Sequence, residues 1–247
     1  MRLKQWLWLP LVWALWAAPD GNGAAARETL TYRIEWRLIT AGLAKLELLA
    51  PPRPGAAWQA NLHLESVGLV SKLFKVEDDY SVNLNQTFCA QSSHMVSHEG
   101  NRQRETRIVY DGAAHKATYL ERDRVKNVVF LSKETEIPGC VHELVGGLFY
   151  LRTLNLQPGQ SAEVGMTDGK KFVMAKVEAQ AREEVRTPAG VFKTIRYEAY
   201  VFNDVLYKRS AHLNVWLSDD ARKLPVQIRV RLQLAIGTIT WLLEKHE

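Results

Sequence analysis

The stretch CVHELVGGLFYLRTL, residues 140–154, has the pattern of a short helix that is apolar on almost every side. Its apolar residues recur at helical spacing in one stripe, which Phe149 and Tyr150 widen: Val141, Leu144, Val145, Leu148 and Leu151. Gly146 and Gly147 each cost roughly 1 kcal/mol of helix propensity relative to Ala, which is tolerable where another backbone passes close by. A helix with so little polar surface must be covered by other parts of the protein. We therefore predict a buried helix that is contacted on more than one side.

The sequence around this helix alternates between apolar and polar residues, as strands with one buried face do. The clearest examples are LTYRIEWRL (residues 30–38), WQANLHLES (residues 58–66) and PVQIRVRLQL (residues 225–234). Turn sequences such as TPAG (residues 187–190) separate these runs, and we expect about a dozen strands with mostly short connections. A solvated face is typical of antiparallel sheets. The chain is therefore predicted to be mainly β and antiparallel.

A single sheet of so many strands twists and curls, and the apolar face on its concave side must be covered. The helix at residues 140–154 is the natural cover. We predict one antiparallel sheet curled into an open or partly closed barrel, with this helix packed in its concave face. A two-sheet sandwich with the helix at one end is the alternative. The segment LVSKLFKV (residues 69–76) is a candidate for a second short helix.

The first residues have the layout of a secretory signal peptide: basic residues, an apolar run and small residues before a cleavage point. The apolar run, residues 6–18, has about 13 residues, fewer than the ~20 that span a bilayer as a helix. Alanines occupy positions 24–26. We expect residues 1–26 to be removed, leaving one β-rich domain, residues 27–247, in the periplasm. An uncleaved membrane anchor is the alternative.

The chain has two cysteines, Cys89 and Cys140. Paired cysteines of an exported protein tend to form disulfides, so we predict a bridge between them. It would close a loop of roughly 50 residues and stabilise the fold by ~4 kcal/mol in the chain-entropy model. Two separate buried thiols are the alternative. Neither cysteine has a second ligand at the spacing of a zinc site, and no metal is expected.

The formal net charge is +5, and the basic residues are scattered along the chain. A nucleic-acid-binding protein would have them clustered, so nucleic acid is not an expected partner. Nucleophile, phosphate-loop and dinucleotide-binding motifs are absent from the sequence. We therefore expect no cofactor and no enzymatic activity.

Several stretches together resemble a family of exported bacterial proteins, the domain of unknown function 3108. They are CVHELVGGLFYLR (140–152), PGQSAEVGMTDGKK (158–171), TPAGVFKT (187–194), VWLSDDARKLPVQIRV (215–230) and IGTITWLL (236–243). The resemblance covers roughly residues 29–243. The helix of that family often begins with His-Asp or Asp-Val, whereas this chain has His142-Glu143. The resemblance implies an envelope β protein similar in shape to periplasmic lipoprotein carriers, and it supplies no catalytic residues.

Two groups of polar residues have compositions that could form a chemical site. His142 and Glu143 could form an acid–base pair at a cavity, but an acidic residue at a helix start also suits the helix dipole. His94, His98 and Glu99 have a spacing that would share a metal on a helix. They lie in a segment with strand character, where residues four apart are ~13 Å from each other. The structural interpretation is favoured for both groups.

The expected function is the binding or carriage of an apolar or amphipathic ligand such as a lipid, because curled sheets leave room for small molecules at their openings. Leu144, Leu148 and Phe149 are the predicted apolar wall, and Arg152 is the predicted contact for an anionic head group. Arg152 could instead cap helix carbonyls or pair with a carboxylate. The alternative function is a non-catalytic structural or interaction module of the envelope with a protein partner.

Overall fold

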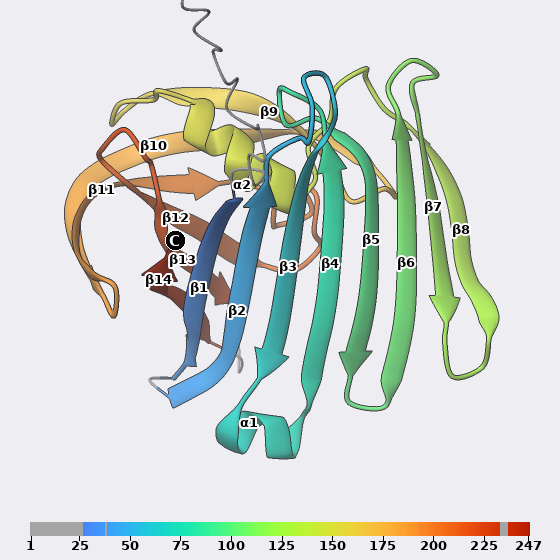
Figure 1. Ribbon diagram of the computed structural model, residues 1–247, viewed down its shortest axis with the longest axis horizontal. Coiled ribbons are helices and arrows are strands. Elements are labelled where there is room, and N and C mark those ends of the chain that lie inside the picture. The colour runs from blue at the N-terminus through green and yellow to red at the C-terminus, as the bar shows by residue number, and fades with distance from the viewer. Residues whose placement is uncertain (1–26, 38, 233–236) are drawn as a thin grey trace, which may run out of the picture.

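The computed structural model of the chain describes residues 27–37, 39–232 and 237–247 (Figure 1). The predicted signal peptide, residues 1–26, lies outside the described residues. Neither of the two described helices has the length and apolar character needed to cross a membrane.

The described residues form fourteen strands and two helices (Figure 1). The strands of the first half are β1 (Arg27–Trp36), β2 (Ile39–Leu49), β3 (Trp58–Ser66), β4 (Val76–Leu84), β5 (Ala90–Glu99), β6 (Arg102–Asp111), β7 (Lys116–Asp123) and β8 (Val128–Glu136). The strands of the second half are β9 (Ser161–Thr167), β10 (Phe172–Thr187), β11 (Gly190–Ala199), β12 (Ala211–Ser218), β13 (Pro225–Leu232) and β14 (Thr238–His246). The helices are α1 (Gly68–Leu73) and α2 (Leu144–Thr153).

All fourteen strands belong to one antiparallel sheet with the order β8-β7-β6-β5-β4-β3-β2-β1-β14-β13-β12-β11-β10-β9. Each half of the chain is a meander, and the two meanders join where β1 pairs with β14. The sheet curls, but β8 and β9 do not pair, so the barrel stays open (Figure 1). The prediction of a curled, open antiparallel sheet is confirmed, and the two-sheet alternative is wrong.

The alternation seen in the sequence appears as alternating burial. In β1, the side chains of Leu30, Tyr32 and Ile34 are buried on the concave side, while those of Thr31 and Arg33 are only partly covered. A period of two places every second side chain on the same face of a strand. The inner face of the sheet is therefore apolar and needs a cover.

The helix α2 provides that cover and joins two apolar clusters. Val145 and Phe149 pack in a cluster built mainly on β1–β8, whereas Leu151 packs in a cluster built on β9–β12. Leu148 contacts both clusters. The prediction of a helix contacted on more than one side is therefore confirmed.

The start of α2 differs from the expectation. Val141 and His142 precede the helix, and His142 forms a parallel bridge with Met166. Glu143 has an extended backbone and is the N-cap residue, so the helix begins at Leu144. Backbone pairing with the neighbouring strand β9 holds residue 142 in an extended conformation, and Val141 is therefore buried outside the helical stripe to which its spacing assigned it.

Gly146 is required by close packing in the first turn of α2. A Cβ atom there would lie 2.8 Å from Cδ2 of Leu84 and 3.3 Å from the backbone oxygen of Phe88. The connection between β4 and β5 thus passes close to the helix at Gly146, as expected for a glycine there. At Gly147 a Cβ atom would instead lie 3.2 Å from the side chain of Met166 on β9. The cost in helix propensity is offset by this close approach.

The predicted disulfide between Cys89 and Cys140 is present, with their Cα atoms 5.3 Å apart. It links the connection before β5 to the segment before α2. The closed loop contains β5, β6, β7 and β8 in full. One end of α2 is thereby fastened to the sheet that it covers.

Asp78 is a carboxyl on the inner face of β4, where only 7% of its surface is exposed. Burial, reinforced by the nearby Glu99, raises its pKa from the ordinary 3.8 to about 6, although it accepts a hydrogen bond of 3.1 Å from the His98 amide. Between these two pKa values the folded state holds a proton that the unfolded state has lost. Its contribution to stability is therefore complete below pH 3.8 and disappears as the pH rises through 6.

We expect Asp78→Asn to stabilise the protein at pH 8 relative to the unchanged chain, by about 1–2 kcal/mol. Asn keeps an acceptor for the His98 amide but carries no charge to bury. Urea unfolding of both proteins at pH 4.5 and pH 8 measures the effect, and the difference between them should widen at the higher pH. A difference that is the same at both pH values would contradict the assignment.

Candidate functional site: an apolar cavity under helix α2

A cavity of about 190 Å³ lies between α2 and the inner face of the second half of the sheet. The helix contributes one wall through Leu144, Leu148 and Leu151. Apolar side chains of the opposite wall come mainly from β9, β10 and β12–β14: Val164, Met166, Ala175, Val177, Leu213, Val215, Ile228, Val230 and Trp241. Leu46 and Leu62 close the side toward the first half. The curl of the sheet thus brings both halves of the chain to one space.

No charged side chain lines the cavity among the described residues. Tyr150 and Tyr207 carry the side-chain oxygen atoms of the lining. Burial raises the pKa of Tyr207, so its hydroxyl stays protonated at neutral pH. A surface of this kind binds hydrocarbon and does not compensate the desolvation of a charged group.

Leu144 marks where the cavity meets solvent. Its side chain lines the cavity and yet is 48% exposed. Neighbouring Val145 also lines the cavity, but it is buried. An apolar ligand could therefore enter beside the first turn of α2 without unfolding of the helix.

The structure separates the four residues predicted to bind a ligand. Leu144 and Leu148 line the cavity. Phe149 points away from it, stacked on Phe88 with ring centroids 6.1 Å apart, and is only 2% exposed. The two nitrogens of Arg152 contact the carboxylate of Glu28 at 2.5 and 2.8 Å. Ligand binding by these residues stays a prediction, and only the two leucines are placed for it.

Arg152 pairs with a carboxylate, which is one of the alternatives to head-group binding that the sequence left open. One of its nitrogens also donates to the backbone oxygen of Arg222 at 2.9 Å. These contacts tie the end of α2 to β1 and to the connection before β13. These hydrogen bonds use Arg152 to hold the end of α2 against the sheet.

Glu143 is a buried cap. Its carboxylate accepts hydrogen bonds from the amides of Val145 and Gly146, and from the Tyr80 hydroxyl at 2.8 Å. Desolvation raises the pKa of this carboxyl, while the three donors act in the opposite direction. Because the side chain is 4% exposed, substrate has no access to it.

His142 is also held by the protein. Its Nδ1 lies 2.8 Å from the backbone oxygen of Phe88, which can only accept, so the hydrogen sits on Nδ1. The ring stacks on Tyr150 at 4.2 Å between centroids. Burial lowers the pKa of His142, which keeps the imidazole neutral. Its free lone pair, on Nε2, therefore points away from Phe88.

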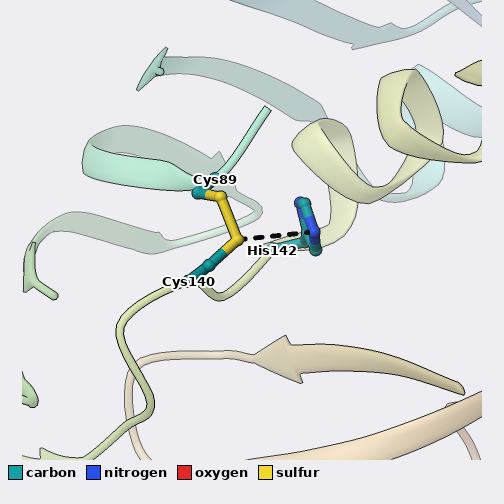
Figure 2. Close-up of side chains that lie close together, drawn as sticks. All are labelled: Cys89, Cys140 and His142. Atoms are coloured by element: carbon teal, nitrogen blue, oxygen red, sulfur yellow. Dashed lines mark hydrogen bonds between the residues drawn. A yellow bond between two sulfur atoms is a disulfide. The ribbon is translucent and has the colours of Figure 1, made fainter. Parts of the chain in front are cut away.

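Figure 2 shows the imidazole of His142 beside the disulfide. Nε2 of His142 lies 3.9 Å from Sγ of Cys140, and Cys89 completes the group. It is the one group of three metal-ligand side chains found within 4.8 Å of one another among the described residues. Both sulfurs are bonded to each other, so neither offers a thiolate to a metal.

His94 and His98 lie in β5, which agrees with their strand pattern. Nε2 of His94 is 2.9 Å from Glu105 on β6. His98 lies beside Arg124, with 3.4 Å between their nitrogens. The two histidines thus have different neighbours, and a cation next to His98 is unfavourable for a metal.

The sequence does not predict which residues line the cavity on the sheet side. Met166 lies in PGQSAEVGMTDGKK, and Ile228 and Trp241 lie in alternating segments. Alternation assigns Ile228 to the apolar face of its strand but not to a cavity. The curl that opposes β13 to α2 is a long-range feature.

The family model described as Protein of unknown function (DUF3108) matches residues 31–244. The chain belongs to this DUF3108 family. The match agrees with the resemblance found over roughly residues 29–243. The cavity and both walls of this DUF3108 chain lie within the matched segment. A search of curated proteins gives no match.

Among solved structures, the DUF3108 chain is similar to a beta-barrel-like protein of the domain of unknown function DUF1849 from Brucella abortus. The TM-score is 0.55 with 8% sequence identity, and the match covers 91% of this chain and 98% of that one. At this identity the similarity shows a shared fold alone. It supports the description of the DUF3108 sheet as barrel-like.

Weaker similarities link the DUF3108 chain to two further structures. One is a DUF1089 family protein from Pseudomonas aeruginosa (TM-score 0.31, 13% identity, 91% of this chain and 95% of that one). The other is a protein assigned as a lipoprotein from Parabacteroides distasonis (TM-score 0.33, 7% identity, 91% and 96%). Neither similarity carries an argument about the fold or function of this chain.

Proposed function

We propose that the protein binds an apolar or amphipathic molecule, such as a lipid, and holds a hydrocarbon segment of it in the cavity under α2. The main support for this proposal is the cavity of about 190 Å³, which is lined by apolar and aromatic residues of both sheet halves and the helix. It is larger than the engineered cavities of about 150 Å³ that take up benzene or xenon. It suits one ring or part of an acyl chain, with the rest of the molecule outside.

The polar part of such a ligand belongs at the opening beside Leu144. The described residues that line the cavity offer no charge to a head group, and Arg152 is already paired with Glu28. A charged head group would therefore remain in contact with water. This arrangement favours selection of ligands by their hydrocarbon part.

The proposal places the protein in the periplasm as a binding protein without catalytic activity. The disulfide fits an oxidising compartment, and residues 1–26 have the pattern of an export signal. Two polar residues that precede α2, His142 and Glu143, are occupied by Phe88, Tyr80 and the helix amides. Among the described residues, the cavity lining holds no carboxylate, imidazole, thiol or amine, and its side-chain oxygens are those of Tyr150 and Tyr207.

Mass spectrometry of an organic extract of the purified protein tests the proposal directly. We expect co-purified lipid or another apolar compound in a fixed ratio to protein. A fluorescent fatty acid gives an independent measure, because its emission increases in an apolar site. Extracts without apolar compounds, together with no fluorescence change, would leave a structural or protein-binding role as the better explanation.

Leu148→Trp should weaken binding of the fluorescent fatty acid about tenfold or more, because the larger side chain fills the cavity. Leu131→Trp is the matched control. Leu131 is partly buried against the apolar cluster built mainly on β1–β8, and it does not line the cavity. Titration of both variants measures the effect, and circular dichroism checks their folding. Equal affinity in the two variants would argue against this cavity as the binding site.

A further inference from the structure

Away from the cavity, the short helix α1 has an unusual composition of exposed residues. The structure buries none of its six residues. Leu69 and Leu73 lie four residues apart, and therefore on one face, with 62% and 74% exposure. Phe74 follows at 53%. Soluble proteins seldom expose such a contiguous apolar group without a binding role.

The exposed group is held in place by the sheet. The Phe74 amide donates to the backbone oxygen of Val70 at 2.8 Å, which closes the last turn of α1. Its ring lies against Gly100 in the turn between β5 and β6, where a Cβ atom would be 2.9 Å from Cε2 of Phe74. The apolar side chains are thus presented by a positioned helix.

Other exposed apolar residues lie at the same end of the sheet. In an antiparallel meander, the connections β1–β2, β3–β4, β5–β6 and β7–β8 share one end, which Figure 1 shows below the strands with α1. We call it the α1 end. Ile39 is 42% exposed there, and Val125 and Val128 in and after the β7–β8 turn are 64% and 50% exposed.

Basic residues accompany both apolar groups, and all of them are exposed: Lys72 and Lys75 beside Leu73, and Arg124 and Lys126 beside Val125. Two carboxylates lie near these basic residues. Glu77 forms an exposed ion pair with Lys75 at 2.7 Å, and Asp123 accepts the amides that close the β7–β8 turn. The α1 end therefore combines apolar and basic side chains.

The opposite end of the first half is different. Its connections are residues 50–57, 85–89 and 112–115. None of these described residues is a large exposed hydrophobic. The combination found at the α1 end is thus not a general property of the turns of this sheet.

We propose that the α1 end docks on the surface of a phospholipid bilayer that contains anionic head groups. Apolar side chains on several turns form a broad front, which fits a planar surface better than a pocket of a protein. Leu69, Leu73 and Phe74 enter the interfacial region, and the neighbouring lysines and arginines contact phosphate groups. The inference goes beyond ligand binding, and it stands even if the cavity holds no lipid.

Co-sedimentation with vesicles tests this docking. The protein used begins at Arg27, where the first strand starts, so that the apolar run at residues 6–18 cannot bind vesicles itself. Vesicles of phosphatidylethanolamine and phosphatidylglycerol (3:1) should bind it, and pure phosphatidylcholine vesicles should bind it about tenfold more weakly. Added salt should weaken the binding to the anionic vesicles.

The double variant Leu69→Glu with Leu73→Glu should lose binding by about tenfold or more. Val109→Glu is the matched control, because Val109 is 56% exposed on a strand away from the α1 end. Hydrogen exchange of the unaltered protein adds a readout that needs no variant: amides of residues 68–75 should become protected on vesicle binding. Equal binding by both variants, protection elsewhere, capture by a protein instead of vesicles, or no vesicle binding would overturn the proposal. The fatty-acid titration of the cavity is unaffected by any of these outcomes.

Discussion

Removing the disulfide by Cys89→Ser with Cys140→Ser is expected to lower the free energy of unfolding by about 4 kcal/mol. The bridge joins residues 51 positions apart, and the loop it closes loses most of its freedom in the unfolded chain. For a chain of this size, the change corresponds to a Tm lower by roughly 8–16 °C. Thermal unfolding of the double variant and of the oxidised protein gives the comparison.

The reduced form of the unaltered protein is the control for that experiment. It should unfold at nearly the same temperature as the double variant, because both lack the same constraint. A Tm that does not change on reduction would mean that the bridge adds nothing beyond the contacts of α2 with the sheet. A large effect confined to the variant would point to the loss of packing around Cys89.

Glu143→Ala is expected to destabilise the fold by about 3 kcal/mol. The substitution leaves the amides of Val145 and Gly146 and the hydroxyl of Tyr80 without their buried acceptor. It also removes the N-cap of the helix that unites the two apolar clusters. Urea unfolding at pH 6 measures the loss.

Glu143→Gln is the conservative control, since its amide oxygen can still cap the helix. We expect it to cost about 1 kcal/mol or less at pH 6. Because burial raises the pKa of Glu143, the stabilising proton is lost as the pH rises, so the unaltered protein should lose stability toward alkaline pH relative to this variant. Equal losses of unfolding free energy in the Ala and Gln variants would contradict the role of the Glu143 side chain as the helix cap.

The parts of the fold that depend on local pattern could be predicted from the sequence. Alternation in β1 identified Leu30, Tyr32 and Ile34 as the buried face, and two cysteines in an exported chain allowed only one bridge. The burial of Asp78 could also be predicted from the sequence, because Asp78 lies two residues before Tyr80 in its strand and hence shares the inner face. No single turn, however, determines that the strands form one sheet of fourteen.

The details of the site depended on contacts between distant residues. Glu143 suits both the cap and the first turn of a helix, and the bridge from His142 to Met166 decides between them. Because α2 is apolar nearly all round, sequence alone cannot tell that Leu148 faces the cavity while Phe149 faces Phe88. The partner of Arg152 lies 124 residues earlier in the chain. Such pairings follow only from the curl of the whole sheet.

The pairing of β1 with β14 has a consequence for folding. It matches Leu30 with His246, so it requires closure of a loop of roughly 200 residues, whereas every other strand pair joins neighbours along the chain. Each meander can therefore assemble early, and the junction between them forms late. Until it does, β1 and β14 are bare strand edges that can pair with other chains, although both end up in the middle of the finished sheet. The chain is most prone to aggregate during that interval.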